Sequence, residues 1–391
     1  MPASKAKNYL YRLALPFFVP RLEAHPEFTV SGSALYTRED CLHLLRKHHV
    51  MGAAVLLRDT SRRSVLLCSS RNPNHPVREN SYFRVASITK MATALAVMIA
   101  AQHGKFDLNQ PFLSYFQGLS APSFLNQITL FHLLSHTSGL ADPMGLEDAL
   151  LEGKPFPELL ETCSSVCIPG KEFHYSNLGF GLVGCILESV YQLPVSEIFK
   201  RLIFDPLKMR ATLDASTLNP EDIVPIVRIH RPFSHGNELR VTPLGKIPLD
   251  SPDPLRHYGH TAGALYVDLP SLEKLLLCLM RKGDPLVSAD FGEEMLRRHA
   301  VYGKSSPALS YGLGILRIQD PSISDSVILG HQGFAYGCAD GAFWEESTGR
   351  MLIQLNGGAS EARKGRLGLY NAEMMKWAFR KEMPNWYRSS L

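Results

Sequence analysis

A long apolar stretch in the first third of the chain constrains the fold most. Residues 91–101 carry no charge and include five alanines, which favour a helix. Gly104 follows at the place where a helix ends. A helix without a charged face must be covered on every side. The sequence therefore predicts a central buried helix over about 87–103, wrapped by the rest of the chain.

Ser87 and Lys90 stand three positions apart at the start of this helix. That spacing places both side chains on one helical face, where an unprotonated amine can take the hydroxyl proton and make the serine a nucleophile. The alternative is a helix-capping serine beside a solvated lysine. The spacing alone does not decide, because it occurs twice more, at Ser4 and Lys7 and at Ser271 and Lys274.

Composition describes an ordinary globular chain. Its 391 residues are 45% hydrophobic and 20% charged, enough for one large domain or two intertwined ones. The formal net charge is only +4 and the basic residues are scattered, so we predict no nucleic-acid partner. The seven cysteines are irregularly spaced, without zinc-ligand spacing, so we expect reduced and mostly buried thiols, no metal and no cofactor.

Residues 1–26 read as an N-terminal extension. Its apolar run, 9–19, is interrupted by Arg12 and Pro16, and no uncharged apolar run reaches 18 residues. We expect no signal peptide, no transmembrane helix and a cytoplasmic protein. An amphipathic segment on a membrane surface stays open as an alternative, together with Trp377 and Trp386 near the C-terminus.

Strand signals lie at both ends of the chain and helix signals in its middle. We expect strands near 50–60, 64–69, 326–329, 339–345 and 350–356, and helices at 130–135, 177–192 and 367–381. The first two strands read as a hairpin. The simplest architecture joins both ends of the chain into one antiparallel sheet.

The predicted fold class is therefore α+β with two lobes, an antiparallel sheet flanked by helices and a second, mostly helical lobe. The α/β lobe comprises 27–105 and 261–391, and the helical lobe 106–260. Within the helical lobe, 211–260 is rich in proline and charge and reads as a long substrate loop.

Two further short motifs complete a catalytic set with Ser87 and Lys90. Tyr175 precedes an apolar helix and can shuttle protons, and Asn177 can position both the lysine and a substrate amide. Taken alone, they also read as a buried aromatic residue and a helix cap.

His331 and Gly333 follow an apolar strand. A glycine there leaves room for substrate at the backbone, so that the amides of Phe334 and Ser87 can face an oxyanion. A strand-end histidine with a satisfied hydrogen bond is the alternative. The rival motif, His257-Tyr258-Gly259, lies in the proline-rich loop with no strand before it.

Together and in this order, Ser87-x-x-Lys90, Tyr175-x-Asn177 and His331-x-Gly333 resemble the serine β-lactamase/penicillin-binding-protein superfamily, in particular its class C β-lactamase-related branch. The phrases at 83–90, 133–140, 175–180 and 204–209 are similar too, and the resemblance spans roughly 45–360.

The resemblance implies that Ser87 is the nucleophile, that Lys90 and Tyr175 form the general-base pair, and that Asn177 positions the substrate. It also implies that the amides of Ser87 and Phe334 form the oxyanion hole. His331 stands where β-lactamases usually carry lysine. A histidine at this position resembles some DD-peptidases and D-aminopeptidases, so the expected efficiency of penicillin hydrolysis is lower. His136 is expected to hold a turn, and large side chains at 332, 334 and 336 to reshape the pocket.

We therefore expect a metal-free serine hydrolase or acyltransferase that acts on a small ester or peptide-like amide through an acyl-enzyme. Three questions stay open: whether water or a second substrate accepts the acyl group, whether the protein is instead a non-catalytic binding or scaffold relative, and whether it acts on lipid-like acyl groups at a membrane surface. The oligomeric state is not predicted.

Overall fold

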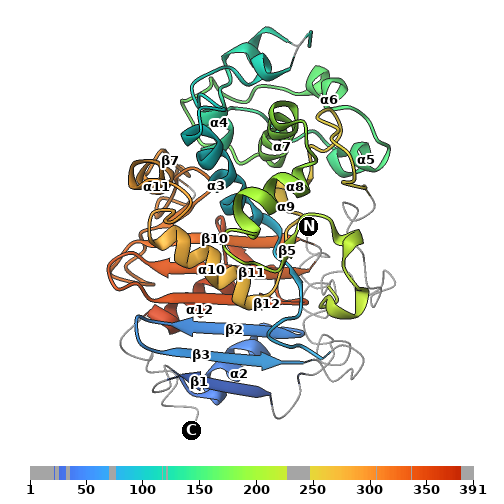
Figure 1. Cartoon of the computed structure of the whole chain (residues 1–391). Coiled ribbons are helices and arrows are strands. Elements are labelled where there is room, and N and C mark those ends of the chain that lie inside the picture. Colours follow the sequence, from blue (N-terminus) through green and yellow to red (C-terminus); the bar gives the residue numbers. More distant parts are fainter. Residues whose placement is uncertain are drawn as a thin grey trace, which may run out of the picture.

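The computed structural model describes residues 22, 26–31, 36–69, 76–116, 118–119, 122–226, 247–304, 306–335 and 337–379. Its largest sheet is antiparallel, with the strand order β1-β3-β2-β12-β11-β10-β9-β8-β7 (Figure 1). The strands are β1 (Glu27–Ser31), β2 (Ala53–Arg58), β3 (Arg63–Cys68), β7 (Ala300–Val301), β8 (Leu309–Tyr311), β9 (Leu316–Ile318), β10 (Ile328–Ala335), β11 (Cys338–Glu345) and β12 (Met351–Asn356).

The pairing of β2 with β12 joins the two ends of the chain, as the sequence predicted. Residues 53–58 run antiparallel to 351–356, and β2 and β3 form the expected hairpin. A strand near the N-terminus thus completes a sheet whose other half lies about 300 residues later.

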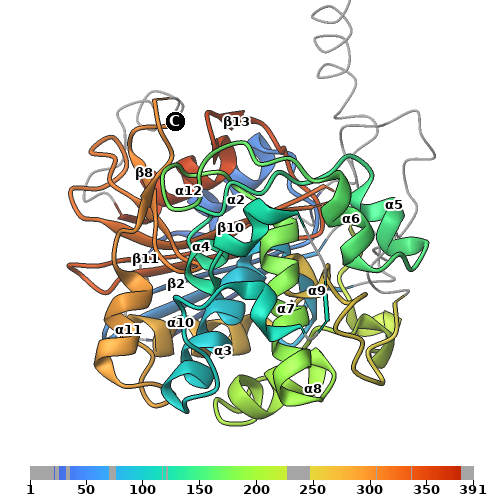
Figure 2. The ribbon, with the colours of Figure 1, turned by 90° about the horizontal axis from the view of Figure 1, so that it is seen from above.

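Both faces of this sheet are covered by helices. Along β2, Ala54 and Leu56 point into one hydrophobic cluster, and Val55 and Leu57 into another, because successive strand residues face opposite sides. Helix α10 (Leu269–Met280) lies on the first face, while α2 (Arg38–Lys47) and α12 (Leu369–Phe379) cover the second (Figures 1 and 2). The sheet therefore forms the middle layer of the α/β part.

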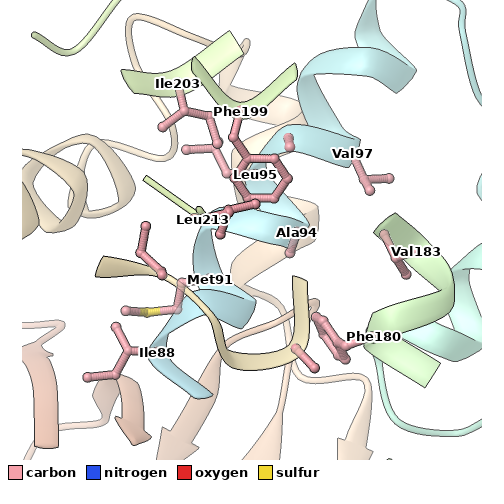
Figure 3. Close-up of a cluster of buried hydrophobic side chains, with 14 of the residues drawn as sticks. Ile88, Met91, Ala94, Leu95, Val97, Phe180, Val183, Phe199, Ile203 and Leu213 are labelled. Carbon is pink, nitrogen blue, oxygen red and sulfur yellow. The ribbon is translucent and has the colours of Figure 1, made fainter. Parts of the chain in front are cut away.

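The predicted central helix is present and buried all round. A single 3₁₀ turn, η1 (Ala86–Ile88), leads into α3 (Thr89–Gln102), in which every residue from Thr89 to Ala100 is buried. It packs against α7 (Asn177–Tyr191), α9 (His260–Gly263), α11 (Ala289–Leu296) and the π-helix η4 (Lys200–Phe204), which continues α8 (Val195–Phe199). Figure 3 shows Leu95 of α3 beside Phe199 of α8.

The remaining elements are short. The helices are α4 (Leu130–Leu134), α5 (Leu146–Leu151), α6 (Phe156–Thr162) and α11 (Ala289–Leu296), and the 3₁₀ turns are η2 (Phe112–Tyr115), η3 (Ser123–Gln127), η5 (Ala215–Thr217) and η6 (Pro220–Asp222). Two small sheets are built from β4 (Phe83–Arg84), β6 (Tyr266–Val267) and β5 (Ala211–Thr212), and from β13 (Arg363–Lys364) and β14 (Leu367–Gly368). The predicted fold class is confirmed, whereas the residue ranges of the two lobes stay a prediction.

Three local predictions differ from the structure. The strand expected at 326–329 continues as β10 to Ala335, so that His331 and Gly333 lie inside it. The last helix begins at Leu369, because 367–368 pair in β14. Within the loop predicted at 211–260, the described residues include β5, η5 and η6, while 227–246 lie outside the described residues, as do 1–21.

None of the seven cysteines, all of which lie in the described ranges, forms a disulfide bond, and six of them are buried. Within the described ranges, no single helix is both long and apolar enough to cross a bilayer. Only the bent pair Asn177–Tyr191 and Val195–Phe204 passes that test, and only jointly.

The closest approach of α7 to the segment before α9 depends on one glycine. A Cβ on Gly181 would lie 1.5 Å from the carbonyl oxygen of Tyr258, whereas one on Gly179 would meet Ser176 Oγ at an ordinary 3.4 Å. The two glycines therefore form a matched pair in one helix.

We predict that Gly181→Ala lowers the melting temperature, since the clash forces the two segments apart at a cost of about 1–3 kcal/mol. Gly179→Ala should be neutral or stabilising, because alanine favours a helix by roughly 1 kcal/mol over glycine. Thermal unfolding of both variants checks this. Equal effects of the two substitutions would contradict the proposed packing.

Candidate active site

A left-handed residue turns the chain from β4 into the central helix. Ala86 has φ of 46°, a conformation that costs a residue with a Cβ roughly 1–2 kcal/mol. The turn places Ser87 at the helix start, partly exposed, while Lys90 lies one turn deeper and is fully buried. Such local strain next to an exposed hydroxyl is a common feature of functional sites.

The buried amine of Lys90 has three hydrogen-bond partners. Its Nζ lies 3.1 Å from Ser87 Oγ, 2.9 Å from Asn177 Oδ1 and 2.7 Å from the carbonyl oxygen of Ala262. Burial lowers the pKa of Lys90 to about 7, against a smaller opposing effect from Asp142. A substantial fraction of this lysine is therefore a neutral amine near neutral pH.

Tyr175 meets the same serine from another direction. Its hydroxyl donates to Ser87 Oγ at 2.8 Å. Burial raises the pKa of Tyr175, which therefore remains a phenol at neutral pH. Among the described residues, Lys90 Nζ bonds Ser87, Asn177 and Ala262 but not the phenol, although it lies 4.9 Å from the centre of the tyrosine ring. The two members of the expected general-base pair thus meet at the oxygen of Ser87 and not in a direct hydrogen bond.

Asp142 orients Asn177 and was missed in the sequence. Its carboxylate accepts from the backbone amides of Asn177 (2.9 Å) and Leu178 (2.9 Å), from Asn177 Nδ2 (3.1 Å) and from Ser176 Oγ (2.7 Å). Because Nδ2 faces the carboxylate, Oδ1 faces Lys90. A carboxylate at a helix N-terminus is also favoured by the helix dipole.

Sequence reasoning could not find Asp142, because it lies about 35 residues before the helix that it caps. A local capping pattern identifies Ser176, whose hydroxyl accepts from Gly179 N, but not a carboxylate supplied by a distant loop.

His331 is buried and has hydrogen-bond partners at both ring nitrogens. Nδ1 lies 2.6 Å from the carbonyl oxygen of Gln332, which can only accept, so Nδ1 carries the proton. Nε2 then accepts from the Tyr311 hydroxyl at 2.9 Å. Burial and the nearby Lys90 lower the pKa of His331 to about 3, so the ring is neutral. Of the described residues, Tyr311 and not Tyr175 is its side-chain partner.

Gly333 brings β10 against the chain that precedes the nucleophile. A Cβ there would lie 2.3 Å from the carbonyl oxygen of Val85. The glycine is thus required by the approach of two backbones, rather than by substrate alone as we expected. Strand β9 pairs with β10 only at 328–330, so the following residues face η1 instead.

The large residues after His331 have different surroundings. Gln332 bonds the carbonyl oxygen of Arg366 (2.6 Å) and the amide of Gly368 (3.1 Å), which anchors the β13–β14 hairpin. Phe334 lines the same cavity as Ser87, with the Arg363 guanidinium 4.0 Å from its ring centre. Tyr336 lies outside the described residues.

His136 holds the turn as the sequence suggested. Its Nδ1 accepts from Ser176 N at 3.2 Å, and its ring lies 4.2 Å from that of Tyr175, centre to centre. Burial, with a smaller effect from the nearby Lys90, lowers the pKa of His136 well below its usual range. The neutral ring of His136 therefore packs against the ring of Tyr175 and helps to fix its position.

The residues of the rival motifs make contacts that stabilise the fold. Ser271 is buried in α10, where its hydroxyl accepts from Arg210 N, and Lys274 is exposed. His257 bonds the buried carboxylate of Glu188. Ser4 lies outside the described residues.

A cavity of about 480 Å³ opens beside Ser87. Its lining includes Ser87, Asn177 and Phe334, so three of the predicted site residues converge on one cavity. Over the described ranges, no cluster of three or more histidine, cysteine, aspartate or glutamate side chains could hold a metal ion.

Comparison with known proteins gives one family and several relatives. The model of the family described as Beta-lactamase matches residues 38–345. The chain is similar to the esterase EstB of Burkholderia gladioli, with 28% identity over 209 residues that cover 47% of this chain and 52% of the esterase. The matched region thus spans about half the length of that curated relative.

Solved structures share the fold. A D-stereospecific amidohydrolase from Streptomyces sp. superposes with a TM-score of 0.65 at 22% identity, covering 82% of this chain and 94% of its own. EstCE1, described as a hydrolase with promiscuous acyltransferase activity, gives a TM-score of 0.67 at 20% identity, covering 86% and 96%. At these identities the likeness establishes the fold alone.

The Lys90 pKa of about 7 predicts how the reactivity of Ser87 depends on pH. Covalent labelling of Ser87 by a fluorophosphonate should speed up as pH rises through about 7 and then level off, because only the neutral amine can take the serine proton. Lys90→Met should lose this step. A rate that is independent of pH between 5 and 9 would exclude Lys90 as the base.

Replacing Asp142 should move that pH profile. The carboxylate raises the Lys90 pKa, so Asp142→Asn should shift the midpoint to lower pH, while the loss of ordered Asn177 slows labelling on the plateau by about tenfold. Asp148→Asn is the matched control, since Asp148 lines the same cavity without bonding Asn177. A midpoint that stays in place or rises would contradict this role.

Proposed function

This chain belongs to the beta-lactamase family, and on that premise we propose that it is a serine hydrolase or acyltransferase acting on small esters or peptide-like amides through an acyl-enzyme on Ser87. One observation carries the proposal: Ser87 Oγ lies within hydrogen-bond distance of both a buried amine and a partly buried phenol. This arrangement supplies a base and an acid at one nucleophile.

Lys90 acts as the base. When neutral, the amine has two N–H groups and one lone pair. Asn177 Oδ1 and the Ala262 carbonyl can only accept from it, so they occupy the two N–H groups and leave the lone pair facing Ser87. The serine proton passes to Nζ as Oγ forms a bond to the carbonyl carbon of the substrate.

Tyr175 acts as the acid. Its raised pKa keeps the phenol protonated, so it can give that proton to the oxygen or nitrogen of the leaving group as the acyl bond breaks. The proton gained by Lys90 balances the one lost by Tyr175, and the two groups meet at the same oxygen. His331 positions Tyr311 instead of sharing this proton, since both of its nitrogens are occupied.

The developing oxyanion is assigned to the amides of Ser87 and Phe334, which belong to residues lining one cavity. Two preorganised backbone donors typically contribute a few kcal/mol each to lowering such a barrier. Water resolves the acyl-enzyme in hydrolysis, and an alcohol or amine does so in acyl transfer. The similar proteins are described as an esterase, an amidohydrolase and a hydrolase with promiscuous acyltransferase activity, and these descriptions support both outcomes.

The neutral His331 argues against efficient penicillin hydrolysis, because it provides no positive charge for a penicillin carboxylate. A purely binding or scaffolding role is disfavoured, since a binding protein has no need for a buried lysine whose pKa is lowered to about 7 beside an accessible serine. A cytoplasmic location, a cofactor-free reaction and the absence of a nucleic-acid partner remain proposals from composition.

Ser87→Ala should abolish the turnover of p-nitrophenyl esters. Tyr175→Phe should lower kcat by about 100-fold or more, because the hydroxyl that bonds Ser87 is removed. The matched control is Ser271→Ala, which removes the serine of the rival Ser-x-x-Lys pair and should leave kcat unchanged. Ester turnover that survives in a correctly folded Ser87→Ala variant would refute the assignment.

A further inference from the structure

The surroundings of Ser87 divide into two sides. Of the described residues, those lining the 480 Å³ cavity include Ser87 and Asn177 but not Tyr175 or His331. Tyr175 approaches the serine from outside that lining. The leaving group must face the proton donor, Tyr175, and so lies on the side of Ser87 away from the cavity. The acyl group then occupies the cavity.

Apolar side chains line one part of this cavity, and charged side chains line another. Leu146 and Leu150 project from α5, Tyr258 comes from the segment before α9, and Phe334 and Ala335 come from the end of β10. Small residues line the part nearest the nucleophile, where a Cβ on Gly263 would already lie 3.5 Å from the Ala86 backbone. The part of the cavity beside Ser87 therefore continues toward the apolar side chains of α5 and β10.

The charged groups on the lining disfavour an anion. Asp142, Glu147 and Asp148 are acidic, and Arg84 is the one basic residue among the described lining residues. Asp142 already receives four hydrogen bonds at the start of α7. A second carboxylate carried on the acyl group would meet net negative charge at the α5 wall.

Building on the proposed acyl-enzyme, we infer that the preferred acyl donors are esters of uncharged aliphatic acids of medium length, hexanoyl to octanoyl, whose chains extend along α5. An acetyl group would leave most of the 480 Å³ cavity unfilled, and this volume lies within the range typical of small-molecule sites. Each methylene that becomes buried favours the transition state by up to about fourfold.

The test uses p-nitrophenyl esters, because a constant leaving group keeps the Tyr175 step the same across the series. We expect kcat/KM to rise by at least about tenfold from acetyl to hexanoyl. The monoester of adipic acid has the same chain length as hexanoyl but ends in a carboxylate, and it should be turned over at least about tenfold more slowly.

Two tryptophan variants on α5 distinguish the filling of the acyl cavity from a general destabilisation of the helix. Leu146 lines the cavity and is partly buried, whereas Leu151 is 47% exposed and does not line it. Leu146→Trp should lower kcat/KM for hexanoyl about tenfold and spare acetyl. Leu151→Trp should leave the whole series unchanged. Asp148→Lys should raise activity on the adipoyl monoester relative to hexanoyl.

The outcomes distinguish this inference from the function on which it rests. Ser87-dependent turnover with a flat chain-length profile, or an equal loss on acetyl and hexanoyl in Leu146→Trp, would overturn the acyl preference and leave the serine hydrolase intact. Faster turnover of the adipoyl than of the hexanoyl ester would also overturn it. Absence of Ser87-dependent turnover with every ester would overturn both proposals.

Discussion

Burial of the Lys90 amine imposes the strictest requirement on this structure. An isolated ammonium group in an apolar interior is costly, so the site must offer acceptors on all sides or favour the neutral amine. It does both: three oxygens surround Nζ, and burial lowers the Lys90 pKa to about 7. Those oxygens come from η1, α7 and α9, so three distant segments must meet before the amine can be buried.

Hydrogen bonds between these segments keep them together around Lys90. The Thr93 hydroxyl of α3 bonds the carbonyl oxygen of Thr261 in α9, and the Thr89 hydroxyl accepts from Leu265 N. Asp142 fixes the start of α7. Further along α7, the buried Glu188 carboxylate bonds His257 and secures the segment that leads into α9. Lys90 is thus held by contacts that extend well beyond its own partners.

The same construction separates the two halves of the proposed reaction. Tyr175, His136 and the Tyr311–His331 pair form a neutral aromatic group on one side of Ser87. On the other side lies the cavity that is bordered by α5. A proton donor on one side and space on the other give an incoming ester only one productive orientation. Substrate preference can therefore change through α5 without disturbing the groups that move protons.

The local features of the structure can be predicted from the residues. Uninterrupted apolar character predicted a buried central helix, and helix α3 is buried from Thr89 to Ala100. Two apolar runs joined by a polar turn predicted the β2–β3 hairpin, and motif order indicated the family and the candidate set around Ser87. In each case the signal lies within a few consecutive residues, where backbone geometry and burial pattern are read directly.

Other features came only from the folded chain. No sequence pattern connects Asp142 to Asn177, identifies the Ala262 carbonyl as a partner of Lys90, or pairs His331 with Tyr311 rather than Tyr175. These contacts join residues that are 20 to 172 positions apart, and they form because packing brings the segments together. The sequence by itself determined the central helix, the sheet-forming ends and the chemical groups available. Tertiary structure decided which of those groups touch, and burial at those contacts decided their protonation states.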